Sequence, residues 1–254
     1  MAESGRNLMA ETTAGRIRVR GAKAGKRKRG LLARVLLWLF GLIVVFPVCW
    51  VLVYRFVPPP MTSLMAIRYF QGRGLDYRWR PLKQISPTLA QAAIASEDAH
   101  FCQHHGFDFT AMQKALEHND QRPNRVRGGS TISQQTAKNV FLWPDRTYVR
   151  KGLEAYFTVL IEALWGKKRI MEVYLNVVEM GKGLYGAEAA SQVDFGHSAR
   201  KMSISEAARL VAILPNPQKY NAVEPGKYVQ RRAGRVAGQV GVVRNDSDLS
   251  GCIR

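Results

Sequence analysis

A glutamate followed closely by polar side chains suggests acid–base chemistry near the middle of the chain. Glu97 ends the apolar run LAQAAIASED, and Asp98, His100 and His104 come soon after it. A carboxylate at the solvent end of an apolar helix is partly desolvated, which suits a general base. An isolated acid at a helix end is more often a solvated surface residue, so this motif needs support from other segments.

The histidines of the same segment could also be read as a zinc site. The segment has no His-Glu-x-x-His motif and no paired cysteines. Moreover, the adjacent His104 and His105 cannot both face one metal from a helix. We expect instead that one histidine orients the acid or hydrogen-bonds the backbone.

The stretch GGSTISQQTAKN, from Gly128 to Asn139, has the composition of an anion-binding site. Glycines let the backbone approach a ligand, and a helix starting after Ser130 would offer free N–H groups and the positive end of its dipole. Further donors are the side chains of Ser130, Thr131, Gln134, Gln135 and Lys138. The Walker motif is absent, which removes the main support for nucleotide hydrolysis. A loop that merely caps a helix is the alternative interpretation.

The segment DRTYVRKGLE adds a second glutamate and a group of cations. Arg146, Arg150 and Lys151 are close in sequence, and Arg150 shares a helix face with Glu154 at i and i+4. A salt-bridged surface is the usual meaning of that spacing. Here the same helix has an apolar stripe that predicts burial, at Leu153, Tyr156, Phe157, Leu160, Ile161 and Leu164. The charged patch is therefore harder to dismiss as an exposed face.

Helical patterns dominate the chain beyond residue 60, and strand signals are few and short. Ser86 and Pro87 are a helix start, and Ser203 with Glu206 forms a capping box. The expected helices run from Pro87 to the Glu97-Asp98 pair, from Ser130 to before Pro144, from Arg146 to Gly166, from Lys168 to Val178, and from Ser203 to Leu214. We therefore expect one mainly α domain at residues 58–245 and a flexible tail at 246–254.

An uncharged run near the N-terminus predicts a membrane span. Residues 35–54 read VLLWLFGLIVVFPVCWVLVY, long enough to cross a hydrocarbon core of about 30 Å. A cleaved signal peptide is the alternative, but the length, the bulky Trp50 and Tyr54 and the lack of a cleavage site argue against it. We expect an uncleaved transmembrane helix at residues 35–57, followed by a stiff spacer of three prolines, Pro58 to Pro60.

The charge of the chain indicates a polyanionic partner and an orientation. The net charge is +19, of which residues 1–34 contribute +8 and the remainder +11. Nucleic acid, anionic lipid and phosphate-bearing substrates all fit such a charge. Basic residues before a span are retained in the cytoplasm, which predicts a cytoplasmic tail at 1–34 and an exported domain. A basic run directly before a span favours this topology over a nucleic-acid arm.

The three cysteines have no metal-ligand spacing. Cys49, Cys102 and Cys252 would leave one thiol unpaired if two of them joined. A bridge between Cys102 and Cys252 is conceivable in an oxidising compartment. We do not expect it, because Cys102 lies inside a dense motif.

Taken in order, these segments resemble the peptidoglycan glycosyltransferases of glycosyltransferase family 51, and closely its monofunctional transglycosylases. The matching motifs are Glu97-Asp98 with Phe101, His104 and Gly106, then GGSTISQQTAKN, then Arg150-Lys151 with Glu154, then RIMEVYLNVVEMGKGLYGAEAAS, and finally SEAARLVAILPNP. The resemblance covers about residues 65 to 243. It implies a mainly α, lysozyme-like helical domain with a small membrane-touching jaw lobe, preceded by one transmembrane helix.

The resemblance also implies roles for individual residues. Glu97 would be the general base on the acceptor's sugar 4-hydroxyl, supported by Asp98 and His104. Glu154 would help the diphosphate leave, directly or through a divalent cation (Mg or Mn), and no cofactor would be strictly required. The substrate-binding residues would be Ser130, Thr131, Gln135, Lys138, Asn139, Arg146, Arg150 and Lys151. Of these, Lys138, Arg146 and Arg150 would hold the phosphates, and Thr131 and Gln135 would line the donor site. His100 stands where many relatives have Arg or Lys, which puts one phosphate contact in doubt.

The implied reaction is polymerisation of lipid II into β-1,4-linked glycan strands with release of undecaprenyl diphosphate. It would take place at the periplasmic face of a bacterial inner membrane, during cell-wall biosynthesis. The implied partners are lipid II, the growing lipid-linked glycan, membrane lipids and cell-wall synthesis or division proteins, without nucleic acid.

Two other functions fit parts of the sequence. A lytic or hydrolytic enzyme could share a helical core with a catalytic glutamate, but it would need neither a span nor the cations at Lys138, Arg146 and Arg150. A membrane-tethered basic protein that binds nucleic acid or anionic lipid would not need Glu97 for its function.

Overall fold

The computed structural model describes residues 23–122, 128–145 and 147–254. Arg146, one of the expected phosphate ligands, lies outside the described residues. The described chain is mainly helical, as predicted, and it divides into two compact units, Met1–Phe46 and Pro47–Arg254. The boundary between these two units, after Phe46, falls inside the predicted span of residues 35–57. Pro47 and the residues after it belong to the second unit.

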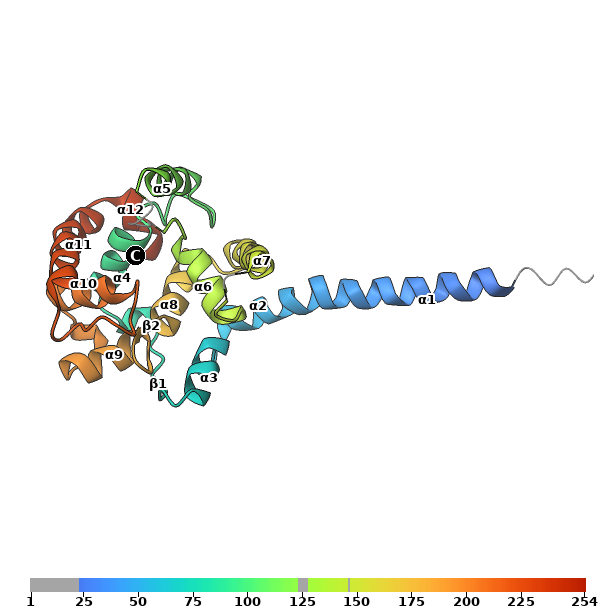
Figure 1. Ribbon diagram of the computed structural model, residues 1–254, viewed down its shortest axis with the longest axis horizontal. Helices are drawn as coiled ribbons and strands as arrows, with labels where there is room; N and C mark the ends of the chain where they lie inside the picture. The colour runs from blue at the N-terminus through green and yellow to red at the C-terminus, as the bar shows by residue number, and fades with distance from the viewer. Residues whose placement is uncertain (1–22, 123–127, 146) are drawn as a thin grey trace, which may run out of the picture. The chain divides into compact units, whose positions relative to one another are not determined.

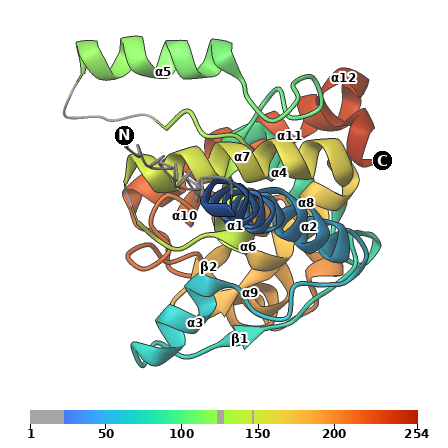
Figure 2. The same ribbon diagram turned by 90° about the vertical axis from the view of Figure 1, so that its right-hand side faces the viewer.

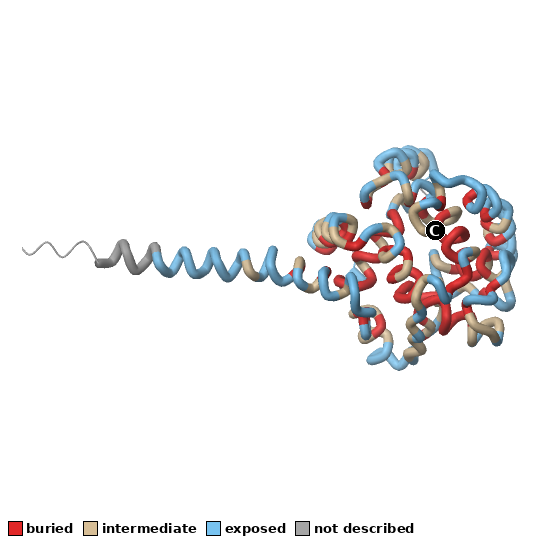
Figure 3. The backbone as a smooth tube through the Cα atoms, turned by 180° about the vertical axis from the view of Figure 1, so that it is seen from behind, coloured by how far each residue is buried: buried red, intermediate tan, exposed pale blue. Residues whose placement is uncertain are grey.

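The N-terminal helical segment consists of three consecutive elements. They are α1 (Lys23–Phe40), the π-helical η1 (Gly41–Val45) and α2 (Phe46–Phe56). The π-helical turn ends two residues before Pro47, whose ring lacks a helical N–H and crowds the turn before it. Residues Gly30–Phe56 are long and apolar enough to cross a membrane. Their large apolar side chains from Leu31 to Phe46 are exposed (Figure 3).

The second unit contains the remaining elements (Figure 1). Its first half comprises α3 (Ser63–Phe70), β1 (Asp76–Tyr77), η2 (Leu82–Gln84), α4 (Pro87–Glu97), α5 (Phe109–Gln121), α6 (Ile132–Phe141), α7 (Tyr148–Leu164) and α8 (Lys167–Val177). Its second half comprises β2 (Glu179–Gly181), β3 (Leu184–Tyr185), α9 (Gly186–Phe195), η3 (Ala199–Lys201), α10 (Ile204–Ile213), α11 (Lys227–Asn245), α12 (Ser247–Ser250) and η4 (Gly251–Ile253). The short strands form one sheet in the order β1-β3-β2, with β3 parallel to β1 and antiparallel to β2.

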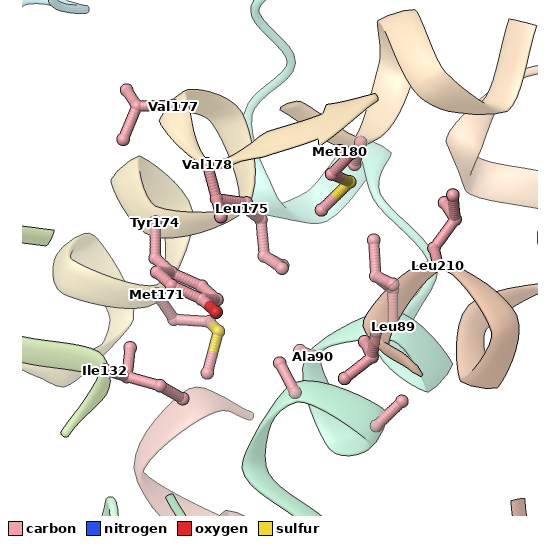
Figure 4. Close-up of a cluster of buried hydrophobic side chains, with 14 of the residues drawn as sticks. Leu89, Ala90, Ile132, Met171, Tyr174, Leu175, Val177, Val178, Met180 and Leu210 are labelled. Atoms are coloured by element: carbon pink, nitrogen blue, oxygen red, sulfur yellow. The ribbon is translucent and has the colours of Figure 1, made fainter. Parts of the chain in front are cut away.

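One hydrophobic core holds the helices of the second unit together. Helix α4 packs against α10 and α11, and α6 packs against α7 and α8 (Figure 2). Side chains from four of these helices and from β2 meet in the centre (Figure 4): Leu89, Ala90, Ile132, Met171, Tyr174, Leu175, Met180 and Leu210. The end of α4 and the start of α6 are therefore fixed relative to each other by a shared core.

Most predicted helix boundaries are confirmed, with one correction. Helix α4 starts at Pro87 after Ser86, and the capping box of Ser203 and Glu206 opens α10. Helix α6, however, is capped by Thr131 and not by Ser130. The Thr131 hydroxyl accepts a hydrogen bond from the backbone N–H of Gln134, and the Gln134 side chain accepts one from the backbone of Thr131.

The C-terminal residues are ordered, contrary to the flexible tail expected at 246–254. They form α12 and η4, Ser250 is buried, and Leu249 and Ile253 pack against the core. Cys252 is joined to Cys102 by a disulfide, with 5.5 Å between the Cα atoms. The expectation that Cys102 remains unbridged is therefore wrong. A helix as short as α12 leaves little periodic signal, and its packing partners are distant in the sequence.

Candidate active site

The carboxylate of Glu97 lies at the end of α4, among donors from three elements. Arg232 of α11 pairs with Oε1 at 2.8 Å, and the Gln135 amide donates to Oε2 at 3.3 Å. The Ser96 hydroxyl also donates to Oε1. The Glu97 side chain is 15% exposed, so a ligand can still reach it. The carboxylate of Glu97 is therefore largely enclosed and held by several donors, and it is not a freely solvated surface acid.

Asp98 ties the end of α4 to the start of α6. It is buried and accepts a hydrogen bond of 2.8 Å from the backbone N–H of Ile132. His104 Nε2 lies 2.9 Å from the same carboxylate, while His104 Nδ1 accepts from the N–H of Gly106. The proton between His104 and Asp98 therefore lies on Nε2. As expected, a histidine of this segment both orients an acid and bonds the backbone.

The start of α6 is less open to an anion than its sequence suggested. Asp98 uses the N–H of Ile132, and the Thr131 hydroxyl uses that of Gln134. Thr131 is buried, and its hydroxyl donates to the carbonyl of Gly106 at 2.7 Å. The positive end of this helix dipole is therefore already balanced by a carboxylate of the protein itself.

A group of charged residues lies where α6 and α7 face each other. Glu154 is buried, with Oε2 2.6 Å from Arg150 Nη1 and Oε1 bonded to Lys151 Nζ. Burial lowers the pKa of Lys138, the charge of Glu154 opposes this shift, and Arg150 and Lys151 add to it. These four residues form what we call the cation cluster: Lys138, Arg150, Lys151 and Glu154.

Neighbouring cavities connect Glu97 with Lys138 of the cation cluster. A cavity of about 760 Å³ is lined by Glu97, Ser130, Gln135, Lys138 and Arg232, among others. Lys138 also lines a second cavity of about 510 Å³, together with Asn139. A third cavity, of about 250 Å³, lies at Glu97 and includes Asp98, Ser130 and Thr131. The glutamate and the lysine that the sequence placed in different helices thus share one cleft.

Seven of the twelve predicted site residues line these three cavities, but Glu154 has a different setting. Both oxygens of Glu154 are engaged by Arg150 and Lys151, and its side chain is 4% exposed. Arg150 is also buried. Among the described residues, Arg150, Lys151 and Glu154 line neither of the cavities that contain Glu97.

Arg232 belongs to the site although no motif pointed to its role, and the buried Tyr174 is influenced by the charges of the site without lining any of the three cavities. Arg232 pairs with Glu97, and the hydroxyl of Tyr174 is buried. Burial raises the pKa of Tyr174, and the charges of Glu97 and Asp98 add to the shift. A stripe of small apolar residues could have predicted α11 itself, at Val229, Ala233, Val236, Val240 and Val243. It could not have predicted which acid Arg232 meets.

The sequence of this chain is similar to those of known transglycosylases. The Transglycosylase family matches residues 65–241. A biosynthetic peptidoglycan transglycosylase of Caulobacter vibrioides is 58% identical over 229 residues, which cover 90% of this chain and 99% of the relative. A protein of the same name from Rhodospirillum centenum is 53% identical, over 79% of this chain and 86% of the relative. Another from Pseudomonas aeruginosa is 47% identical, over 86% of this chain and 94% of the relative.

The family match spans the elements that form the cleft, from α3 to α11. The Caulobacter relative is matched over nearly its whole length, which includes the apolar N-terminal helix of this chain. The chain therefore belongs to the transglycosylase family and is a peptidoglycan glycosyltransferase of cell-wall synthesis.

Proposed function

We propose that the protein polymerises lipid II into β-1,4-linked glycan strands and releases undecaprenyl diphosphate. The observation that supports this most directly is the shared cavity of about 760 Å³, which brings Glu97 and Lys138 together. The reaction needs one group to accept the proton of the acceptor hydroxyl and another to stabilise negative charge on the leaving diphosphate. A carboxylate and an ammonium in one cleft meet both needs.

Glu97 acts as the general base in this proposal. The acceptor's 4-hydroxyl gives its proton to the carboxylate while its oxygen bonds to the anomeric carbon of the donor sugar, and the bond from that carbon to the diphosphate oxygen breaks. Arg232 and Gln135 hold the carboxylate in position, at 2.8 and 3.3 Å. Asp98 and His104 support Glu97 indirectly, because they fix the turn that follows it.

The cation cluster binds the diphosphate in this proposal, with Arg146 contributing as well. Lys138 lines the cleft, and Glu154 holds Arg150 and Lys151 next to each other in spite of their mutual repulsion. Positive charge in a site shielded from water stabilises developing negative charge strongly. Glu154 thus assists the leaving group through its cationic neighbours.

We propose that no cofactor is required. A divalent cation, Mg or Mn, would at most accompany the diphosphate, because such an ion can be held largely by substrate phosphates and water. Glu154 is a poor ligand for Mg or Mn in this arrangement, because Arg150 and Lys151 already bind both of its oxygens. Polymerisation should therefore continue at an undiminished rate when a chelator is added. A chelator-sensitive rate that Mg or Mn restores would refute this part of the proposal.

The protein is proposed to span the bacterial inner membrane once, with residues 1–34 in the cytoplasm and the catalytic domain in the periplasm. The disulfide between Cys102 and Cys252 supports this orientation, because disulfides persist in oxidising compartments. Helix α3 exposes Tyr69 and Phe70, which suits the membrane-touching jaw that the family resemblance implies.

The test is a polymerisation assay with the full chain in detergent and purified lipid II. We expect glycan chains from the unaltered protein and a loss of about a thousandfold or more in Glu97→Gln, equivalent to about 4 kcal/mol of barrier, with substrate binding retained. Glu117→Gln is a matched control, because Glu117 is an exposed acid on α5.

The same assay separates the two alternative functions. A lytic enzyme would shorten finished glycan without building any from lipid II. A basic binding protein would be indifferent to Glu97→Gln. Either outcome would reject the proposed function.

A further inference from the structure

The C-terminal turns of α2 are built into the catalytic unit. Val51 is fully buried, and its carbonyl accepts a hydrogen bond of 2.7 Å from the indole N–H of Trp165. Arg169 of α8 donates to the carbonyl oxygens of Tyr54 and Val57, at 2.7 and 2.9 Å. The bond to Tyr54 satisfies a carbonyl that α2 leaves unpaired at its end. The last part of the apolar helix is thus fixed to the domain and is not a loose tether.

An aromatic cluster joins the same turns to α6 and α7. The rings of Phe141 and Phe157 are stacked, with centroids 4.6 Å apart and an interplanar angle of 4°. Trp50 meets both edge-on, at 5.2 and 6.2 Å, and Tyr54 lies 6.0 Å from Phe141. We use "aromatic cluster" for Trp50, Tyr54, Phe141 and Phe157.

The two phenylalanines lie one helical turn from two members of the cation cluster, Lys138 and Glu154. On α6, Phe141 follows Lys138 by three positions, and on α7, Phe157 follows Glu154 by three positions. Residues at i and i+3 are neighbours on a helix surface. The separation of α6 and α7 at the aromatic cluster therefore also sets the separation of Lys138 from the ion pairs of Glu154.

We propose that Trp50 is a positioning residue for the diphosphate site, so that the apolar N-terminal helix supports catalysis as well as anchoring the protein. This inference rests on the proposed function, in which the cation cluster binds the diphosphate. Removing the indole leaves a void that the packed rings can fill only by shifting. A shift of α6 against α7 moves Lys138, and a displacement of about 1 Å can cost about a hundredfold in rate.

The effect falls mainly on kcat. The negative charge on the diphosphate oxygen grows as its bond to the sugar breaks, so a misplaced cation weakens the transition state more than the bound substrate. A residue that only anchored the protein in the membrane would alter neither kcat nor KM for lipid II supplied in detergent micelles.

The test compares full-length variants in that assay, with thermal unfolding measured for each. We expect Trp50→Ala to lower kcat about ten- to a hundredfold, with KM changed less. Trp50→Phe should restore most of the activity because it retains an aromatic ring. Trp38→Ala is the matched control, since Trp38 is 81% exposed in the same apolar run, and it should match the unaltered protein. If Trp50→Ala unfolds, Trp50→Leu replaces it and should show the same fall in kcat at a retained Tm.

A double-mutant cycle with Lys138 separates a positioning role from a general loss of activity. In a Lys138→Ala background, Trp50→Ala should cause little further loss, because interacting sites are not additive. Fully additive losses, or a folded Trp50 variant as active as Trp38→Ala, would overturn the inference while leaving the proposed function intact. Failure of the unaltered protein to polymerise lipid II would instead reject the proposed function.

Discussion

Arg232, on α11, donates a hydrogen bond of 2.8 Å to the carboxylate of Glu97 at the end of α4. The two residues are 135 positions apart in the sequence. The proposed base is thus held by a cation on a helix that no chemical motif identified. The same guanidinium also donates to the Ser96 hydroxyl, which fixes its position beside α4.

Arg232→Gln should slow polymerisation about ten- to a hundredfold. A hydrogen bond to a charged group contributes about 1.5–3 kcal/mol, and each 1.4 kcal/mol is about tenfold in rate. The rate with lipid II measures the effect. Arg231→Gln removes the same charge from an exposed neighbour on α11 and should have little effect. Equal rates for the two variants would contradict a role for the Arg232–Glu97 contact.

The activity should fall at alkaline pH because Lys138 loses its proton early. Burial lowers the pKa of Lys138 below the ordinary value of 10.5, and only the protonated side chain attracts phosphate. We therefore expect kcat/KM to decrease as the pH rises through this lowered pKa. Lys138→Arg should hold its kcat/KM to higher pH, because a guanidinium stays charged. Lys182→Arg, at an exposed lysine, should keep the profile of the unaltered protein.

The same shift makes a prediction for stability. In the pH range between the lowered pKa of the folded protein and 10.5, the unfolded chain binds more protons at Lys138 than the folded one does. The contribution of Lys138 to the free energy of unfolding therefore increases with pH across that range. Denaturant titrations at several pH values should show this increase in the free energy of unfolding for the unaltered protein. The Lys138→Met variant should lack it. An unchanged slope would mean that the lysine is not desolvated.

The disulfide between Cys102 and Cys252 should stabilise the domain. It closes a loop of 150 residues, for which loop-closure entropy gives about 5 kcal/mol, while measured effects are typically about 2–4 kcal/mol. Cys102→Ser and Cys252→Ser should lower Tm by similar amounts, and the double variant should lower it no further. Cys49→Ser removes the exposed free cysteine and should leave Tm unchanged. Modification of Cys102 by a thiol reagent in unreduced protein would contradict the bridge.

Local sequence patterns determined where the helices are and where the acid lies. Ser86 with Pro87 starts α4, so the end of the apolar run after it places Glu97 at the helix terminus. The capping box at Ser203 and Glu206 likewise starts α10. Such signals can be read from sequence because they depend on residues within a turn or two of each other.

Only the tertiary structure decided which of these elements meet. The pairing of Arg232 with Glu97, the bridge from Cys102 to Cys252 and the use of the α6 N-terminus by Asp98 all join residues far apart in the chain. An apolar stripe predicts that a helix face is buried, but it does not name the neighbour that buries it. That choice follows from packing all the helices around one core at once, because each contact depends on the positions of all the others.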